Sequence, residues 1–237
     1  MFTNQTVVVV GGTSGIGLRV AQQVIAQGGS AWIGGRSRGK LDQALALLGP
    51  RASGGTVDVA EPASIAAFFA PIGTIDHLFT PGASYVTGPI GTLDEEAAQS
   101  PFRSKFWGQY WSVRYALPKL SAQASVVLMA GAAGARPMRG AAAYAACNSA
   151  LEGLGRALAL ELAPRRVNTV SPGTVDSPLW RDRPQAQREA AYQASSAANA
   201  LQRVGHVDEI ADAVLFLMRN AYTTGSTLYP DGGYTLR

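Results

Sequence analysis

Residues 6–17 have the sequence TVVVVGGTSGIG, and this stretch decides the fold of the chain. The apolar run Thr6–Val10 predicts a buried parallel strand, because a strand of that kind is covered on both faces. The glycines after it permit a tight turn, and a helical pattern follows from about Ile16. Such a turn directs the N–H groups of a helix N-terminus at a phosphate. The stretch therefore predicts a phosphate-binding turn between a strand and a helix.

Strands and helices alternate through the rest of the chain. We expect further strands at residues 31–34, 56–59, 75–80, 125–130, 167–170 and 227–229, and helices at 16–27, 40–48, 62–69, 93–117, 142–162 and 208–218. Pro101 predicts a break in the helix at 93–117, and residues 178–204 predict an irregular segment. The alternation predicts an α/β fold, a Rossmann-type doubly wound parallel sheet with helices on both faces. No repeat or linker divides residues 1–237, so we expect one domain.

Composition argues against several classes of protein. Hydrophobic residues make up 47% of the chain and charged residues 15%, which is ordinary for a soluble globular domain. The net charge of +4 comes from scattered basic residues, so we expect no nucleic-acid partner. One cysteine, Cys147, and two histidines predict no internal disulfide and no metal site. The apolar stretches are too short for a membrane span, and no leader is evident, so we expect a cytoplasmic protein without a membrane partner.

The end of the second predicted strand indicates which dinucleotide binds. An acidic side chain at that point hydrogen-bonds the adenosine ribose of NAD. Here Gly35 occupies the position, and Arg36 follows with a planar cation that suits phosphate oxygens. Ser37 adds a hydroxyl and Arg38 a second cation, although a solvated pair of surface arginines is the alternative. We expect NADP(H), held by Arg36, Ser37, Arg38 and the turn residues Gly11, Thr13, Ser14, Gly15, Ile16 and Gly17.

The G-x-x-x-G-I-G pattern of residues 11–17 resembles that of the short-chain dehydrogenase/reductase family. Further motifs of that family match in order along essentially the whole chain: Val57-Asp58-Val59, Arg166-Val167-Asn168, Ser171-Pro172-Gly173, Arg203-Val204-Gly205, Thr224-Gly225 and Asp231-Gly232-Gly233. The resemblance implies that Asp58 and Val59 contact the adenine. It also implies that Gly82, after the fourth strand, and the segment with Pro172, Gly173 and Val175 contact the cofactor.

The catalytic residues of the family are matched only in part. Its members usually carry a tyrosine that gives or takes the proton, a lysine one helical turn later, a serine from the fifth strand and an asparagine from the preceding helix. Tyr144 matches the tyrosine. Asn148 stands at the lysine position, Lys105 at the asparagine position and Gly131 at the serine position. The lysine and the asparagine have therefore exchanged places, and the serine has no counterpart.

Two interpretations of this exchange stay open. In the first, the Lys105 ammonium reaches the pocket from the neighbouring helix and depresses the pKa of Tyr144. The chain is then an NADP(H)-dependent oxidoreductase that transfers a hydride between the nicotinamide and a carbonyl or alcohol substrate, with Tyr144, Lys105 and Asn148 as catalytic residues. In the second, the site has decayed, and the chain is a catalytically impaired NADP(H)-binding protein, a sensor or an interaction partner. We favour the first, because decay gives no reason for a lysine at that neighbouring position.

Other side chains bear on turnover and on the substrate. Loss of the serine hydroxyl predicts slow turnover, and Ser84 is a candidate replacement. Residues 178–204 occupy the place of the family's substrate lid, although a solvated helix face is the alternative. In that segment Trp180 and Tyr192 are candidates to cover an apolar substrate. Candidates to attract an acid are Arg181, Arg183 and Arg188, and candidate pocket walls are Tyr85, Pro137 and Met138.

Aromatic residues on the predicted helix at 93–117 indicate self-association. They recur every four residues and make a wide apolar surface: Phe102, Phe106 and Tyr110 form one row, and Trp107, Trp111 and Tyr115 form another. One row suffices for packing against the core, so the second predicts a partner helix. In the family this helix commonly pairs across a two-fold axis, and we expect a homodimer or a homotetramer.

Overall fold

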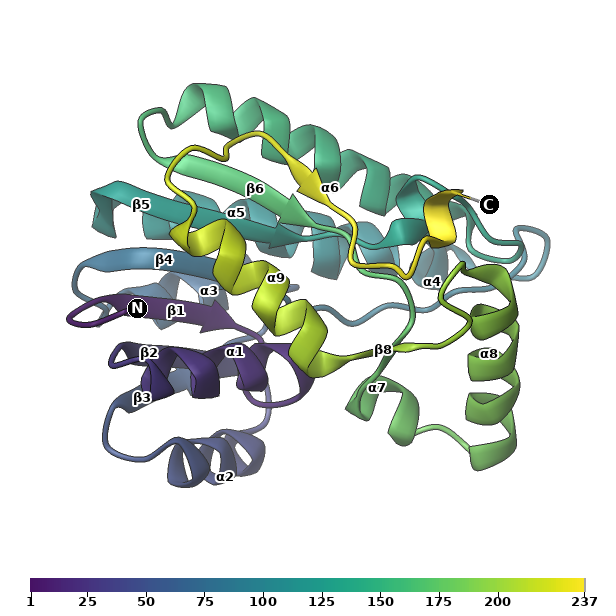
Figure 1. Cartoon of the computed structure of the whole chain (residues 1–237), viewed down its shortest axis with the longest axis horizontal. Coiled ribbons are helices and arrows are strands. Elements are labelled where there is room, and N and C mark those ends of the chain that lie inside the picture. Colours follow the sequence, from purple (N-terminus) through teal and green to yellow (C-terminus); the bar gives the residue numbers. More distant parts are fainter. Residues whose placement is uncertain (237) are drawn as a thin grey trace.

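The structure is a computed structural model that describes residues 1–236, and a seven-stranded sheet forms its centre (Figure 1). The strand order is β3-β2-β1-β4-β5-β6-β9, and all neighbouring strands are parallel. The strands are β1 (Thr6–Val10), β2 (Ser30–Gly35), β3 (Ala52–Thr56), β4 (Ile75–Thr80), β5 (Leu120–Met129), β6 (Arg166–Val170) and β9 (Thr227–Leu228). A separate short pair joins β7 (Val175–Asp176) to β8 (Gly205–His206).

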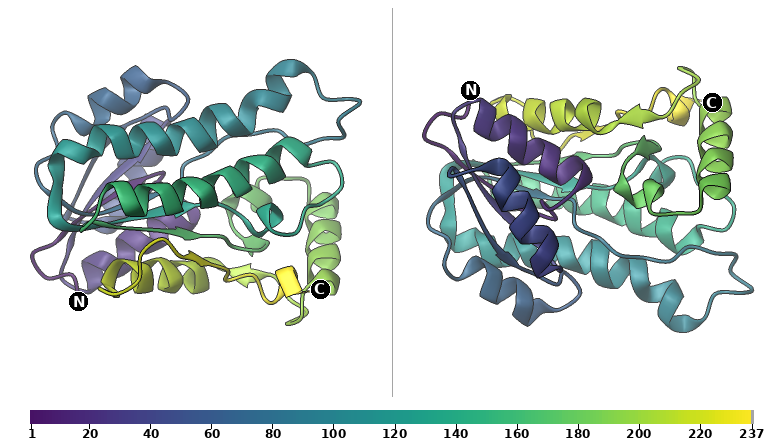
Figure 2. Two further views of the ribbon diagram at one scale, coloured as in Figure 1. Left: turned by 90° about the horizontal axis from the view of Figure 1, so that it is seen from above. Right: turned by 90° about the horizontal axis from the view of Figure 1, so that it is seen from below.

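Helices cover both faces of the sheet (Figure 2). One face is packed by α1 (Gly15–Ala26), α2 (Arg38–Leu48) and α9 (Val207–Arg219), the other by α3 (Pro62–Phe69), α5 (Trp107–Ala116) and α6 (Ala142–Glu161). The remaining helical segments are α4 (Glu95–Ser100), α7 (Pro178–Arg181), α8 (Gln185–Ala198), a π-helical turn at Pro101–Phe106 and single 3-10 turns at Leu117–Lys119, Ala132–Gly134 and Tyr234–Leu236. The predicted Rossmann-type doubly wound sheet is confirmed. Within residues 1–236, no helix combines the length and the apolar character that crossing a membrane requires.

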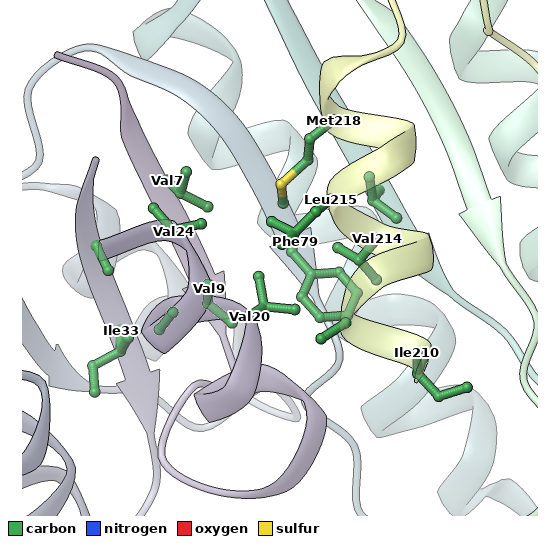
Figure 3. Packing of buried hydrophobic residues seen from close by; sticks show 14 of the residues in the cluster. Val7, Val9, Val20, Val24, Ile33, Phe79, Ile210, Val214, Leu215 and Met218 are labelled. Carbon is green, nitrogen blue, oxygen red and sulfur yellow. The ribbon is translucent and has the colours of Figure 1, made fainter. Parts of the chain in front are cut away.

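The apolar run of β1 serves two separate cores. Val7 and Val9 pack against α1 and α9 (Figure 3), whereas Val8 and Val10 pack against α3 and α5. This division follows from the strand itself, because successive side chains point to opposite faces. All four valines are at most 1% exposed. Burial on both faces fixes β1 in the middle of the sheet and, with it, the glycine-rich turn at its carboxyl end.

Three predicted elements are wrong in position or type. The third strand is Ala52–Thr56 and not residues 56–59, because Gly54 and Gly55 form part of it. A Cβ at Gly54 would clash with the Ile33 carbonyl oxygen, so glycine here allows close strand pairing and does not mark a loop. The fifth strand is Leu120–Met129, so it begins before the predicted range of residues 125–130 and ends one residue earlier. Residues 178–204 contain α7 and α8 and are therefore not an irregular segment.

The predicted break at Pro101 is confirmed, and its form matters for the site. α4 ends at Ser100, and the π-helical turn Pro101–Phe106 leads into α5. Proline has no N–H to donate to the preceding turn, which favours a change of helix type at this point. The wider turn buries Ser104 and Lys105, both 4% exposed. A lysine that an exposed helix face would have left in water is thereby placed inside the protein.

The carboxyl ends of the central strands meet at one edge of the sheet. Gly11 follows β1, Gly82 follows β4 and Gly131 follows β5 at this edge. β1 and β4 are neighbours, and the strand order reverses between them. In open α/β sheets, ligands bind outside the carboxyl ends at such a reversal. The predicted cofactor and catalytic residues therefore lie along the edge where a ligand is expected.

Candidate active site

The turn after β1 presents bare backbone at the start of α1. Gly11 has a φ of 105°, and a Cβ there would lie 2.5 Å from the Gly82 nitrogen. A Cβ at Gly17 would clash with the Gly11 carbonyl oxygen. Ser14 precedes α1 without a side-chain capping bond, so the first N–H groups of the helix have no side-chain partner. The six turn residues thus form a cradle that fits a pyrophosphate, at the N-terminus of a helix.

Gly35 closes the end of β2 against this turn. A Cβ at Gly35 would lie 2.6 Å from the Thr13 methyl carbon, so any side chain there would displace Thr13. Arg36, the next residue, is exposed and takes part in no salt bridge within residues 1–236. The position that carries a ribose-binding acid in NAD proteins is therefore without a carboxylate and is followed by an available cation.

Ser37 and Arg38 are committed to α2. The Ser37 hydroxyl accepts the Lys40 N–H at 3.3 Å and caps the helix. The Arg38 guanidinium forms a salt bridge with Asp42 at 2.9 Å, one helical turn later. Of the three predicted phosphate ligands, Arg36 is consequently the one whose side chain has no competing partner among the described residues.

Asp58 and Val59 follow β3 and stay close to the end of β2. The Val57 N–H donates to the Gly35 carbonyl at 3.1 Å, which holds the segment there. The Asp58 carboxylate accepts the Ala60 N–H at 2.9 Å. This bond closes a local turn and fixes the direction of the chain. Val59 is buried, and contact of these two residues with an adenine stays a prediction.

The remaining predicted cofactor residues occur in loops at the same edge. The Gly82 N–H donates to the Val10 carbonyl at 2.8 Å, which ties the loop after β4 to β1. The Pro172 carbonyl accepts the Ala132 N–H at 2.9 Å. A Cβ at Gly173 would lie 3.0 Å from the Cα of Asp231, so the backbones pass closely, and Val175 then begins β7.

Lys105 reaches into the site from the π-helical turn. Its ammonium donates to the Ala130 carbonyl at 2.8 Å and to Asn148 Oδ1 at 2.7 Å. It lies 4.9 Å from the centre of the Tyr144 ring. Lys105 belongs to none of the salt bridges of residues 1–236, so its buried charge is met by neutral acceptors and an aromatic ring. The structure thus brings together Lys105, Asn148 and Tyr144.

The surroundings of Tyr144 favour its ionised form. Burial raises the pKa of Tyr144, but the charge of Lys105 and hydrogen bonds from neighbouring side chains outweigh burial. The pKa of Tyr144 is lowered from its ordinary value near 10 as a result. Asn148 is one of the side chains that lower the pKa of Tyr144. Its amide N–H also donates to the backbone carbonyl of Tyr144 at 2.8 Å. A group of this kind is suited to give and take a proton.

Gly131 lies directly beside the tyrosine hydroxyl. A Cβ at this position would be 3.1 Å from Tyr144 Oη and 3.3 Å from Asn148 Oδ1. Contacts of 3.0–3.4 Å to a Cβ are tighter than most real ones, so a side chain here would force its neighbours to give way. A serine at position 131 would therefore press on Tyr144 and Asn148, and glycine leaves room for these two side chains as they lie.

Tyr85, which the sequence indicated only as a pocket wall, is the closest aromatic neighbour of Tyr144. The two rings are stacked with centroids 4.5 Å apart and planes 25° from parallel. Lys105 lies 5.8 Å from the Tyr85 ring. Tyr85 follows β4 in a loop without periodicity, so no sequence signal beyond its proximity to Gly82 marks it. Ser84, the suggested replacement donor, is exposed.

The segment at 178–204 contains the helices α7 and α8 and has its own polar contacts. The rings of Trp180 and Tyr192 meet edge to face at 6.0 Å. Arg181 makes two hydrogen bonds to Asp176, at 2.9 and 2.8 Å, and is thereby neutralised. Arg183 lies over Trp180, 4.4 Å from its ring, and has no salt bridge within residues 1–236. Arg188 makes only a long contact to a backbone carbonyl, and Pro137 and Met138 are exposed.

Comparison with known proteins identifies the family. A family model described as Enoyl-(Acyl carrier protein) reductase matches residues 10–235. A short-chain dehydrogenase/reductase of Stachybotrys chlorohalonatus is 28% identical over 262 residues, which cover 98% of this chain and 98% of that protein. A cis-4-hydroxycyclohexanecarboxylate dehydrogenase of Sinomonas cyclohexanicum is 30% identical over 247 residues, which cover 99% of this chain and 98% of that protein.

Solved structures agree with this assignment. The structure of a small-chain dehydrogenase in complex with NADPH superimposes with a TM-score of 0.85 and 28% identity, over 99% of this chain and 100% of that one. The chain therefore belongs to the short-chain dehydrogenase/reductase family of oxidoreductases.

Proposed function

We propose that this chain is an NADP(H)-dependent oxidoreductase that interconverts a carbonyl compound and an alcohol, with Tyr144 as general acid and base. The observation that carries the proposal is the Lys105 ammonium, 4.9 Å from the centre of the Tyr144 ring. A fixed positive charge beside a phenol favours the phenolate. In this proposal Lys105 does from the π-helical turn what a lysine at position 148 would do from α6.

The residues present fit a nicotinamide dinucleotide phosphate. When bound, this cofactor supplies or accepts the hydride. The bare backbone of residues 11–17 fits the pyrophosphate, and the cation of Arg36 fits a 2′-phosphate. Gly35 offers no carboxylate that would repel that phosphate. The similar dehydrogenase solved with NADPH also supports NADP(H) over NAD(H).

Proton transfer is the task of the protein in this reaction. In reduction, Tyr144 Oη gives its proton to the substrate oxygen while the carbonyl carbon accepts the hydride. The O–H bond of Tyr144 breaks, the O–H bond of the alcohol forms, and the electron pair stays on the tyrosine oxygen. The resulting phenolate is stabilised by Lys105, whose ammonium is held by the Ala130 carbonyl and by Asn148. In oxidation, the phenolate takes the proton back.

We also propose a class of substrate. Residues 178–204 would act as a lid, and Arg183 would meet a carboxylate of the substrate. Two observations support this: Arg183 is exposed and has no salt bridge among the described residues, and its guanidinium is held over the Trp180 ring at 4.4 Å. The Sinomonas relative, named for a hydroxycyclohexanecarboxylate, supports it further. The substrate class that we propose is therefore a small carbonyl acid. We also propose that the protein acts in the cytoplasm, without nucleic-acid or membrane partners.

The test is an assay of NADPH oxidation with a panel of aldehydes and ketones that includes 4-oxocyclohexanecarboxylate. We expect at least one member to be reduced, with NADPH preferred over NADH. Tyr144→Phe is expected to lower kcat by about 100-fold or more, because it removes the proton donor. Tyr222→Phe is the matched control, because Tyr222 is fully exposed and far from the site. Equal activity of the Tyr144→Phe and wild-type proteins would overturn the mechanism.

The second candidate is an NADP(H)-binding protein that does not turn over, and Gly131 is the observation that favours it. A serine hydroxyl that orients the substrate oxygen contributes about 2–4 kcal/mol at the transition state when present. Position 131 has no hydroxyl to offer. This candidate predicts that NADPH binds, by fluorescence titration, while no member of the panel is reduced.

A further inference from the structure

Tyr85 occupies a place that the proposed mechanism does not use. Its ring stacks on that of Tyr144, with centroids 4.5 Å apart and planes 25° from parallel. Lys105 lies within 5.8 Å of the Tyr85 ring and 4.9 Å of the Tyr144 ring. One ammonium therefore lies beside two stacked phenol rings.

The loop that carries Tyr85 is held firmly at the site. The Ser84 N–H donates to Ser104 Oγ at 3.1 Å, and the Ser104 hydroxyl donates back to the Ser84 carbonyl. On the other side of Tyr85, the Val86 N–H donates to Ser100 Oγ at 2.9 Å. Ser104 precedes Lys105 in the π-helical turn and is 4% exposed. Tyr85 and Lys105 are thus positioned by the same stretch of chain.

Two other positions near Tyr144, Gly131 and Ser84, do not supply a hydroxyl here. Gly131 has no side chain, and its Cα faces Tyr144 Oη so closely that an added Cβ would lie 3.1 Å from that oxygen. Ser84 is exposed, and its backbone alone contacts Ser104. Among the described residues, the hydroxyl-bearing side chain stacked on Tyr144 is that of Tyr85, with ring centroids 4.5 Å apart.

We propose that Tyr85 is a positioning residue that orients the Tyr144 ring by stacking and donates a hydrogen bond to its oxygen once Tyr144 has lost its proton. Tyr85 itself stays protonated throughout: burial and the neighbouring Tyr144 raise the pKa of Tyr85 well above 10. A hydrogen bond to a phenolate is stronger than one to a neutral phenol. The interaction therefore stabilises the state of Tyr144 that follows proton transfer. The inference rests on the proposed function only in that Tyr144 gives up a proton.

Several titratable groups face the pair and must be kept in view. Lys105 approaches from the π-helical turn, Cys147 from α6 and Arg183 from residues 178–204. Burial raises the pKa of the Cys147 thiol to about 11. Because the pKa of Tyr144 is lowered, the tyrosine that ionises first as the pH is raised is expected to be Tyr144.

The first experiment follows tyrosinate formation by ultraviolet absorbance as the pH is raised, in the protein without cofactor or substrate. We expect the wild type to show one tyrosine that ionises before the others, and Tyr144→Phe to abolish that step. Tyr85→Phe keeps the stacked ring and removes the hydroxyl, so it is expected to move the step to higher pH. Tyr222→Phe, at a fully exposed position, is expected to leave it in place. An unmoved step in Tyr85→Phe overturns the proposal.

The second experiment separates hydroxyl from ring through turnover. With a substrate found in the carbonyl panel, Tyr85→Phe is expected to lower kcat about tenfold near neutral pH, with KM within about twofold. The pH profile of kcat is expected to shift upward with it. Tyr85→Leu, which also removes the stacked ring, is expected to lose more. Equal loss in both variants without a shifted profile means that Tyr85 acts by packing alone, which overturns the hydrogen-bond role. If no carbonyl is reduced but the absorbance step still shifts, the proposed function fails and this inference stands.

Discussion

At Lys105, a buried ammonium is satisfied without a carboxylate. Burying a charge is costly unless it is fully hydrogen-bonded or paired. Two N–H groups of the ammonium donate to the Ala130 carbonyl and to Asn148 Oδ1, and Tyr144 is the acidic group next to it. The missing counter-charge is therefore supplied when Tyr144 ionises. Each of the two groups makes the charged form of the other less costly.

The exchange of lysine and asparagine can be tested as a pair. Lys105→Met is expected to lower kcat by about 100-fold while NADPH still binds, because the charge that stabilises the phenolate is gone. Lys105→Asn and Asn148→Lys are each expected to impair turnover, and the double variant is expected to recover part of it. The measurement is kcat and NADPH affinity for the wild type, Lys105→Asn, Asn148→Lys and the double variant, which together form a double-mutant cycle. Strictly additive losses would show that the two positions do not act on the same proton.

The choice of cofactor depends on Arg36. Arg36→Leu is expected to raise KM for NADPH about tenfold or more and to leave KM for NADH nearly unchanged, because only NADPH carries the 2′-phosphate. Arg38→Leu is the matched control, since the Arg38 cation is already paired with Asp42 at 2.9 Å. The check is steady-state kinetics with both cofactors. A larger effect of Arg38→Leu than of Arg36→Leu would mean that Arg38 binds the 2′-phosphate and would contradict the assignment to Arg36.

For single residues, the sequence predicted which residues form the site better than it predicted which side chains are in contact. The spacing around Tyr144 was enough to pair Lys105 with Asn148 as exchanged residues, and the structure brings their side chains to 2.7 Å. Tyr85 could not be found in the same way, because its loop has no periodicity and its partner is far away in the sequence. The stacking exists only because the loop after β4 is held by Ser104.

Among the elements, α6 shows how a helix is fitted to the sheet. Gly155 faces β6, and a Cβ there would clash with Thr169 Oγ1, a side chain that is 1% exposed. Gly153 lies on the same helix, and a Cβ there would meet nothing closer than 3.9 Å. Gly155 therefore lets α6 approach β6 closely, whereas Gly153 plays no part in this contact. Tyr144 and Asn148 lie near the start of α6, so the packing of α6 against β6 determines how deeply these two side chains lie in the protein.

These two glycines allow a matched stability measurement. Gly155→Ala is expected to destabilise the protein by about 1–3 kcal/mol through overpacking. Gly153→Ala is expected to stabilise it by about 0.5–1 kcal/mol, because alanine is the better helix former and the site is open. Chemical denaturation of both variants gives the free energies of unfolding. Similar destabilisation in both would mean that helix propensity and not contact with β6 decides the result.

Element boundaries followed the sequence where apolar periodicity was strong and failed where close packing was the cause. β1 and β4 coincide with their predicted ranges, because their apolar runs are continuous. β3 was misplaced, since its glycines resemble a loop and their reason for being there is the Ile33 backbone alongside. The helices at 178–204 were missed because the residues of α8 are mostly polar and none is fully buried.

Across the whole molecule, a buried histidine makes stability depend on pH. His77 lies in β4, is 5% exposed and hydrogen-bonds Ser125 at 2.7 Å. Burial lowers the pKa of His77 from 6.5 to about 4, with Asp76 opposing the change and Arg166 adding to it. The unfolded chain therefore binds a proton at a pH where the folded protein does not. The resulting stability is complete above about pH 6.5 and is lost as the pH falls to about 4.

The free energy of unfolding is expected to fall by about 3 kcal/mol over that interval from this residue. Denaturation at several pH values between these limits measures it. His77→Gln is expected to flatten this part of the profile, whereas His206→Asn, at the exposed other histidine, is expected to keep it. A profile that is equally steep in His77→Gln would assign the acid sensitivity to other groups.

Assembly is the second property of the whole molecule that we predict. Trp107 is 45% exposed and, with Trp111 and Arg103, lines a groove of about 320 Å³ that α5 and the π-helical turn form with Ala60 and Pro62 at the start of α3. We propose that a second copy of the chain covers this face in a homodimer or homotetramer. Size-exclusion chromatography is expected to show the larger species, and Trp107→Asp is expected to shift it towards the monomer. Tyr222→Asp is the control, and a monomeric wild type would contradict the proposal.

The origin of Lys105 in a different helix from Tyr144 also affects how function is inferred from genomes. A filter that requires a lysine four residues after the tyrosine classifies this chain as inactive, because position 148 is asparagine. A filter based on three-dimensional placement retains it, since the ammonium lies 4.9 Å from the Tyr144 ring. Family members dismissed on the linear motif therefore merit a second inspection for a lysine entering from the preceding helix.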